Sequence, residues 1–276
     1  MSGQHACIRA DILSIGVLAP GLDGWPAARA VLAGEAAFVP ADIVVPPSPR
    51  LAAAERRRLN VNARWALAVA SEALAAAPEW DHGALNCVFA SADGDGDVLA
   101  QTLAALARPP VVLSPTLFHN SVFNAPAGYC SIAHRLQGAS TSVCAAEFTF
   151  GAALVEAFDQ VTVDGVPVLF VAVDTAYPLE LAAVRASVPS FACALLLRPA
   201  SGEARSAHGS IAIAPLAAGA PSHRDRATAP SAWGRYWRGD TAAAALPLLA
   251  AIARRAQASV AIAQPKGCAF EADYRP

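Results

Sequence analysis

The order of elements predicted along the sequence indicates an α/β fold with a mixed or parallel sheet. Short apolar runs of strand length alternate with helical segments through most of the chain. Residues 166–173 are continuously hydrophobic, which is typical of a central strand covered on both faces. Of the 276 residues, 55% are hydrophobic and 15% are charged. This composition can build a substantial core and excludes a disordered protein.

Strands are predicted where short apolar runs end at turn residues. Six of them cover residues 8–17, 85–91, 140–144, 166–173, 193–197 and 211–216. Two further short strands are predicted around Val260 and Phe270.

Helices are predicted over residues 25–34, 50–77, 98–106, 126–134, 147–158 and 241–256. Gly34 is a stop signal for the first helix. Residues 40–49 are proline-rich and form a predicted loop. The second half of the 50–77 segment is almost entirely apolar, as in a helix buried on most of its surface. Ser114 and Pro115 mark a turn before the 126–134 helix.

The character of the sequence changes near Pro221. Residues 222–231 are polar and flanked by proline, which is typical of a linker. We therefore assign residues 1–220 to the main unit. Residues 221–276 supply a linker, a helix and short strands that complete or cap the same domain.

Charge and cysteine usage exclude several classes of protein. The net charge is -2, so neither nucleic acid nor an anionic membrane surface is an expected partner. No apolar run approaches the roughly 18 residues of a membrane span, and Arg9 and Asp11 interrupt any signal-peptide pattern. The six cysteines include no CxxC pair and lie mostly in apolar segments. They are predicted to be buried thiols of a cytoplasmic protein.

An acidic stretch formed by Asp93, Asp95 and Asp97 resembles the start of a calcium loop. Such a loop requires glutamate at its twelfth position, where this chain has Ala104. A turn that caps the following helix is the better interpretation. We predict no metal site and no organic cofactor.

Residues 114–157, which read SPTLFHNSVFNAPAGYCSIAHRLQGASTSVCAAEFTFGAALVEA, resemble the central motif of β-ketoacyl synthases. Asn124, Ala127 and Gly128 match an Asn-x-x-Ala-Gly element of that family. Glu147 falls where the family has its nucleophilic cysteine. The resemblance covers residues 8–215. It implies a thiolase-like fold, with a mixed sheet and helices on both faces, that corresponds to the N-terminal half of a duplicated fold plus a short C-terminal extension.

Two departures from the family pattern determine the expected function. In the family, the cysteine accepts acyl groups as a thiolate, and the helix N-terminus favours this ionised form by lowering the pKa of the thiol. A carboxylate at Glu147 would instead form an anhydride, which makes it a poor acyl acceptor. The family's two catalytic histidines come from the second half, but the only histidine after Pro221 is His223. The resemblance therefore implies a non-catalytic relative, similar to chain length factors and to short proteins of aryl polyene and xanthomonadin-type clusters.

The resemblance also implies partners. A chain length factor pairs with a full-length ketosynthase, and an acyl carrier protein meets that complex. Four residues are expected at the acyl tunnel and interface, namely Thr116, Leu117, Phe118 and Asn124. The alternative for residues 116–118 is that they fill the local core.

An independent acyltransferase or thioesterase is the second hypothesis for function. Cys144 would then be a displaced nucleophile, and His119 would be its base. The structural alternatives are a buried thiol at Cys144 and an ordinary loop hydrogen bond at His119. Glu147 is either a carboxylate that stabilises a helix N-terminus or part of the closed end of the tunnel.

Overall fold

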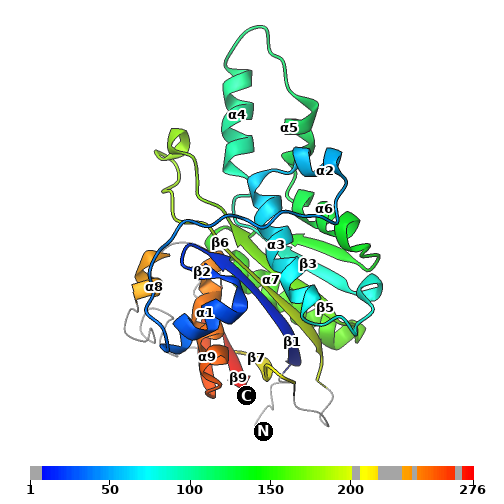
Figure 1. Ribbon diagram of the computed structural model, residues 1–276, viewed down its shortest axis with the longest axis vertical. Helices are drawn as coiled ribbons and strands as arrows, with labels where there is room; N and C mark the ends of the chain where they lie inside the picture. The colour runs from blue at the N-terminus through cyan, green and yellow to red at the C-terminus, as the bar shows by residue number, and fades with distance from the viewer. Residues whose placement is uncertain (1–7, 201–205, 217–231, 238–240, 265–268) are drawn as a thin grey trace.

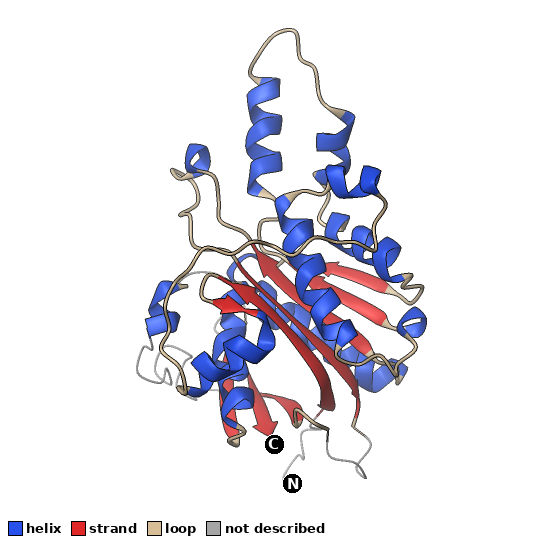
Figure 2. Cartoon of the chain, in the orientation of Figure 1, coloured by secondary structure: helices blue, strands red, loops and turns tan. Residues whose placement is uncertain are grey.

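A computed structural model describes residues 8–200, 206–216, 232–237, 241–264 and 269–276. One nine-stranded sheet runs through the molecule in the order β4-β3-β5-β6-β1-β7-β9-β8, with β2 paired to β1. Helices cover both faces of this sheet (Figure 2). At one end of the long axis, α4, the loop after it and α5 project from the body as an arm, defined as residues 96–124 (Figure 1).

The strands are β1 (Ile8–Ala19), β2 (Leu22–Asp23), β3 (Asn86–Ala90), β4 (Ser140–Val143), β5 (Val168–Asp174), β6 (Phe191–Pro199), β7 (Ser210–Pro215), β8 (Ala258–Ala263) and β9 (Ala269–Arg275). The α-helices are α1 (Gly24–Ala33), α2 (Ala53–Arg58), α3 (Val61–Ala75), α4 (Gly96–Leu106), α5 (Pro115–Asn120), α6 (Ala125–His134), α7 (Thr149–Asp159), α8 (Ala232–Tyr236) and α9 (Leu246–Arg254). Short helical turns include η2 (Ala146–Phe148), η3 (Gln160–Asp164), η4 (Leu179–Leu181) and η5 (Ala242–Ala245).

The sheet is mixed, as the sequence predicted. β3 pairs in parallel with both β4 and β5, and the other neighbours along the sheet are antiparallel. Each parallel pair is connected through helices, because parallel strands cannot be joined by a tight turn.

The central strands are buried on both faces, which explains their continuous apolar sequence. Along β5, Val168 and Phe170 enter the core beneath α7, α1 and α9, whereas Leu169 and Val171 enter the core beneath α3 and α6. Alternate side chains of a strand point to opposite faces, so both sets must be apolar. No helix in the described part of the chain is long and apolar enough to cross a membrane.

The helix predicted over residues 50–77 is in fact two helices. Asn60 is extended between α2 and α3, and its side chain accepts a hydrogen bond of 2.8 Å from the backbone of Ala63. This N-cap starts a new helix inside an otherwise helical pattern. The turn predicted at Ser114 is likewise the start of α5, because Ser114 caps that helix and Pro115 occupies its first turn.

The C-terminal segment shares the core of the main sheet. β9 pairs with β7, and Trp237 is buried against Phe38 and Phe191. The boundary predicted near residue 220, the linker at residues 222–231 and His223 lie outside the described residues.

Candidate functional site

A tight turn between β4 and α7 carries Glu147, at the place that the sequence assigned to the nucleophile. Ala146 adopts a positive φ of 48°, which is unfavourable for a residue with a Cβ. The Thr149 hydroxyl holds the turn together, since it donates to the carbonyl of Ala146 at 2.6 Å and accepts from the amide of Ala145 at 2.9 Å. Strain of this kind persists only where the surroundings enforce it.

Glu147 itself lies in the short turn η2, and α7 begins two residues later at Thr149. The Glu147 side chain is exposed, and no residue in the described part of the chain forms a hydrogen bond or ion pair with it. Its carboxylate can therefore interact with the α7 N-terminus and with solvent or a partner. A carboxylate is also a poor acceptor for an acyl group from a thioester.

Cys144 and His119 are placed on different elements. Cys144 follows β4 and is exposed, so its interpretation as a buried thiol is wrong; its Sγ donates to the Ala92 carbonyl at 3.0 Å. His119 is exposed on α5, where its ring contacts Tyr129 edge-on. No hydrogen bond joins Cys144 to His119 in the described residues. The buried-thiol prediction holds for Cys87, Cys130 and Cys193.

The residues expected at the acyl tunnel lie together at the base of the arm. Thr116, Leu117 and Phe118 belong to α5, and Asn124 directly precedes α6. The side chain of Phe118 is 71% exposed, and Thr116 and Asn124 are also exposed. Phe118 therefore does not fill the core of its own chain.

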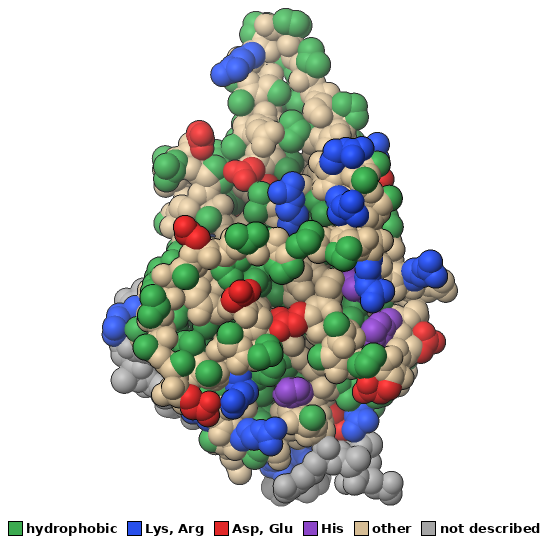
Figure 3. All heavy atoms as spheres, in the orientation of Figure 1, with side chains coloured by type: hydrophobic (Ala, Val, Ile, Leu, Met, Phe, Trp, Pro, Cys, Tyr) green, Lys and Arg blue, Asp and Glu red, His purple; other side chains and the backbone are tan. Residues whose placement is uncertain are grey.

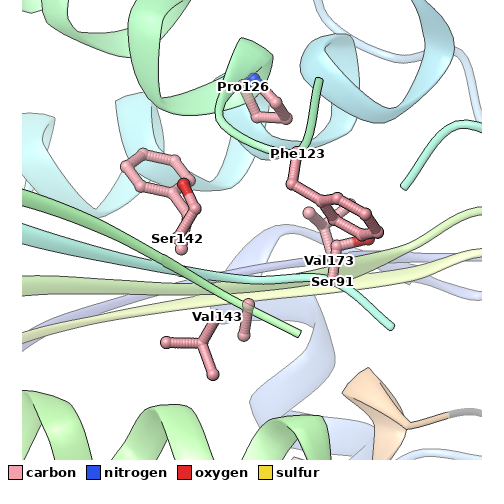
Figure 4. Close-up of a pocket in the computed structure, with 8 residues that line it drawn as sticks. Ser91, Phe123, Pro126, Ser142, Val143 and Val173 are labelled. Carbon is pink, nitrogen blue, oxygen red and sulfur yellow. The ribbon is translucent and has the colours of Figure 1, made fainter. Parts of the chain in front are cut away.

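A very small cavity lies between the β4 edge and the start of α6. It has a volume of about 10 Å³, which is room for about one water molecule. Figure 4 shows Phe123, Pro126 and Ser142 on one side of the strands, with Val143 pointing to the other side. The Ser142 Oγ is buried without a hydrogen-bond partner in the described residues, and a single water could satisfy it.

A larger cavity of about 300 Å³ lies at the junction of the arm and the body. Its walls come from the start of α3, the 93–95 loop, one face of α4, and the residues between α5 and α6. Sequence reasoning did not find this cavity, because its walls come from segments that are distant in the chain. The only signal was the acidic 93–97 stretch, whose predicted capping role is confirmed: Asp95 accepts a 3.0 Å hydrogen bond from Val98 at the start of α4.

Asp174 is the last residue of β5, and its side chain connects this strand to the C-terminal segment. Its carboxylate accepts hydrogen bonds from the backbone of Ala92 at 2.8 Å and of Ala242 at 3.1 Å, and from the hydroxyls of Ser91 and Thr241. Burial raises the pKa of Asp174, and these hydrogen bonds oppose that rise. Sequence analysis did not single out this residue.

The mixed sheet with helices on both faces, and the strand, turn and helix around Glu147, make this an α/β protein. Residues 30–245 match the model of the β-ketoacyl synthase N-terminal domain family. This match spans more than half of the chain, and the chain belongs to this family. Among curated protein sequences, none matches the chain.

Solved structures show the same fold. A chain of the ketosynthase (ApeO) in complex with its chain length factor (ApeC) from Xenorhabdus doucetiae is 22% identical, with a TM-score of 0.68 over 96% of this chain and 98% of that chain. A chain of the ishigamide ketosynthase/chain length factor is 16% identical, with a TM-score of 0.68 over 96% and 99% of the two chains.

A third similar chain belongs to AntDE:AntF, a type II polyketide synthase acyl-carrier protein in complex with its ketosynthase. It is 10% identical, with a TM-score of 0.75 over 98% of this chain and 99% of that chain. At these identities the likeness shows the thiolase-like fold that the sequence predicted. Each similar chain is covered almost completely, so the likeness includes the C-terminal elements.

Proposed function

We propose that this chain is a non-catalytic subunit, similar to a chain length factor, that pairs with a full-length β-ketoacyl synthase during acyl-chain elongation. The observation that carries the proposal is Glu147. It occupies the strained turn between β4 and α7, where the resemblance to the family would place the nucleophile, and a carboxylate there cannot take over the role of a thiolate. The partner would supply the cysteine and the histidines.

The arm offers an extensive apolar surface for such a partner. Figure 3 shows apolar side chains along this projection. Its exposed large apolar residues are Leu99, Leu103, Leu106, Val111, Val112, Leu113, Phe118, Val122 and Phe123. So many exposed large apolar side chains on one projection are typical of a protein interface rather than of a monomer.

The free edge of β4 supports pairing at the same side of the molecule. β4 ends the sheet and has β3 as its only strand neighbour in the described part of the chain. Its outer backbone groups can therefore bond to a strand of another chain. α6 next to this edge exposes Ile132, and α7 exposes Val155. An edge strand flanked by apolar side chains favours a stable protein contact.

The position of residues 116–118 suggests how this subunit acts. Thr116 and Phe118 are exposed on α5, and a docked ketosynthase would bury them. Phe118 would then stand at the end of the partner's acyl tunnel, where one aromatic side chain determines how far a chain can extend. The acyl carrier protein would deliver substrates to the complex in the cytoplasm. Elongation of aryl polyene-type chains is the specific pathway we propose, on the basis of the resemblance of the sequence to short proteins of aryl polyene and xanthomonadin-type clusters.

Condensing assays with the reconstituted pair test the assignment of roles. We expect malonyl-dependent elongation to require both chains and to survive Glu147→Ala and Cys144→Ala in this chain. Loss of activity with either variant in an intact complex would contradict a non-catalytic role. Loss with Cys144→Ala, together with acylation of Cys144 by a thioester, would instead establish the acyltransferase or thioesterase alternative.

A further inference from the structure

Helix α5, which carries Phe118, packs on the body of the molecule mainly through one polar residue. Asn120 is 6% exposed and is the only buried residue of this helix. Leu117 is half-buried, and the other α5 residues are exposed. Hydrophobic packing, which is not directional, therefore contributes little to the place of α5 on the body. That place depends on the hydrogen bonds that Asn120 makes.

Both polar atoms of the Asn120 side chain are used. Its Nδ2 donates to the carbonyl of Arg58 at 2.6 Å, and its Oδ1 accepts from the hydroxyl of Tyr129 at 3.1 Å. Arg58 is the last residue of α2, where a helix has no donor of its own for its carbonyls. Tyr129 lies on α6 and is only 2% exposed. The side chain of Asn120 thus connects α5 to both α2 and α6.

The backbone of Asn120 adds a connection to α3. Its carbonyl accepts from the Nδ2 of Asn60 at 3.3 Å, and the Oδ1 of Asn60 caps α3 by accepting from Ala63. Hydrogen bonds are directional, and a buried donor or acceptor without a partner is costly. A satisfied buried network of this kind therefore specifies one orientation of α5 on the body.

The same geometry sets the direction of Phe118. Successive residues of an α-helix are rotated by about 100°, so side chains two positions apart point in nearly opposite directions. Asn120 is buried against the body, and Phe118, two residues earlier, is 71% exposed. A rotation of α5 about its axis would move Phe118 along the surface, and it would also break the bonds of Asn120 to Arg58 and Tyr129.

Asparagine is the side chain that fits these two partners. The Arg58 carbonyl needs a donor, and the Tyr129 hydroxyl donates to an acceptor. An amide supplies one of each in a fixed geometry, whereas an ionised aspartate has no donor and a leucine has neither group.

We propose that Asn120 is a positioning residue: its hydrogen bonds fix the direction in which Phe118 leaves the body, and this narrows the range of product lengths made by the complex with the ketosynthase. The proposal rests on the proposed function, in which Phe118 stands at the end of the partner's acyl tunnel. A Phe118 held in one direction stops chains at one length. A Phe118 on a loosely held helix stops them at several lengths.

Distances measured by electron spin resonance on the full chain alone test the positioning. Nitroxide labels on Cys144 and on a second cysteine, introduced by Thr116→Cys, report the place of α5 relative to the end of β4 in a chain that also carries Cys7→Ser and Cys268→Ser. Asn120→Ala removes two side-chain hydrogen bonds, so the population with a displaced α5 should rise about tenfold or more. The distance distribution should broaden accordingly, and an unchanged distribution would overturn the proposal.

Two further variants separate positioning from a general loss of stability. Tyr129→Phe keeps the ring that packs edge-on against His119 and removes only the hydroxyl that bonds to Asn120, so it should broaden the distribution as well. Asn86→Ala makes the same chemical change at the start of β3, where the Asn86 side chain accepts from the amide of Ala139 at 2.9 Å. It should leave the distribution as it was. Equal broadening by Asn86→Ala would contradict a positioning role.

Product lengths in the reconstituted pair test the consequence for function. At equal concentrations of intact complex, Asn120→Ala and Tyr129→Phe should give products of several lengths where the unchanged chain gives one predominant length. Phe118→Ala should instead shift the products to a longer length without this spread. A purely structural role of Asn120 would lower the amount of complex and leave the length distribution unchanged, which would overturn the proposal.

The two proposals fail in different ways. If no complex with a ketosynthase forms, the proposed function is wrong, and the distances in the chain alone still decide whether Asn120 positions α5. If the complex forms and elongates chains, and the distances broaden while the product lengths do not, only the link from Asn120 to product length is wrong.

Discussion

At the scale of single residues, the turn before α7 combines a strained backbone at Ala146 with the exposed carboxylate of Glu147. Ala146 is one of the few non-glycine residues with positive φ in the described structure, and it immediately precedes Glu147. The Thr149 hydroxyl bonds to both sides of the turn and holds this conformation in place. The fold therefore enforces a backbone conformation at Ala146 that is unfavourable on its own.

Glycine substitutions measure the strain in this turn. Ala146→Gly removes the conflict between Cβ and a positive φ, which is worth about 1–2 kcal/mol. The neighbouring Ala145 has a φ of -142°, so Ala145→Gly relieves nothing and costs about 0.4–1 kcal/mol through the unfolded chain. In denaturant unfolding, Ala146→Gly should therefore be about 1–2 kcal/mol more stable than Ala145→Gly. Equal stability of the two variants would show that Ala146 is not strained.

His134 should make stability depend on pH. Burial, together with Arg50 and His82, lowers the pKa of His134 to about 4 from 6.5. Below about pH 6.5, His134 therefore binds a proton in the unfolded chain but stays neutral in the folded protein. The free energy of unfolding therefore decreases as the pH falls from about 6.5 toward 4. His134→Gln should flatten this part of the profile. Glu72 and Asp174 also have raised pKa values, but the wild-type protein and the His134→Gln variant both contain these two residues. The difference between the two pH profiles therefore reports on His134. Parallel pH profiles for the two proteins would contradict the assignment.

The sequence placed Glu147 between a strand and a helix, because contiguous apolar runs lie on both sides of it, and the structure has it in η2 between β4 and α7. It did not reveal the exposure of Cys144, since an apolar neighbourhood suggests burial but β4 ends at Val143 and the chain turns outward. It also missed Asp174 and Asn120. Each forms a hydrogen bond to a residue more than 60 positions away, and no local pattern carries that information.

At the scale of elements, the helices of the arm bury few of their residues. α4 and α5 expose apolar side chains along their length, and only Gly96, Val98 and Asn120 among their residues are buried. A helix with such a surface is stable in a complex that covers it.

A charge on α5 tests whether the arm binds the ketosynthase. Phe118→Asp places a carboxylate where the proposed interface is apolar. Aromatic residues at the centre of an interface typically contribute about 2 kcal/mol to binding, so the affinity for the ketosynthase should fall by tenfold or more. Val44→Asp is the control, because Val44 is 91% exposed on the loop before α2 and lies outside the arm. Native mass measurements at several concentrations give both affinities. Equal affinities would exclude α5 from the interface.

Strands were easier to predict than helix boundaries. The continuous apolar run of β5 has one explanation, burial on both faces, and the structure agrees. By contrast, the break between α2 and α3 depends on one asparagine, Asn60, that caps the second helix. The pattern of apolar residues along the sequence does not reveal such a break. The start of α5 at Ser114 depends on the same kind of local hydrogen bond.

At the scale of the whole molecule, Asp174 joins the C-terminal segment to the central sheet. We propose that residues 221–276 complete the domain rather than form a second one. Removing the carboxylate with Asp174→Ala leaves buried donors unsatisfied, and stability should fall by about 3 kcal/mol or more while unfolding remains one transition. Asp97→Asn, at an exposed position on α4, should change stability by less than about 1 kcal/mol. Two separate unfolding transitions would indicate two domains.

The whole-molecule fold followed from the alternation of elements and from the central motif. The extension of the sheet from β7 to β9 did not, because these two strands are more than 50 residues apart in the sequence. The arm was also unforeseen. Its helices were partly predicted, but their projection from the body is a tertiary property that no single segment encodes.

The native mass of this chain, measured alone and after co-expression with a full-length ketosynthase from the same source, tests the central claim most directly. We predict a stable one-to-one complex that survives dilution and is lost with Phe118→Asp. A chain that stays apart from the ketosynthase and turns over acyl thioesters alone would contradict the account and direct attention to Cys144 and His119.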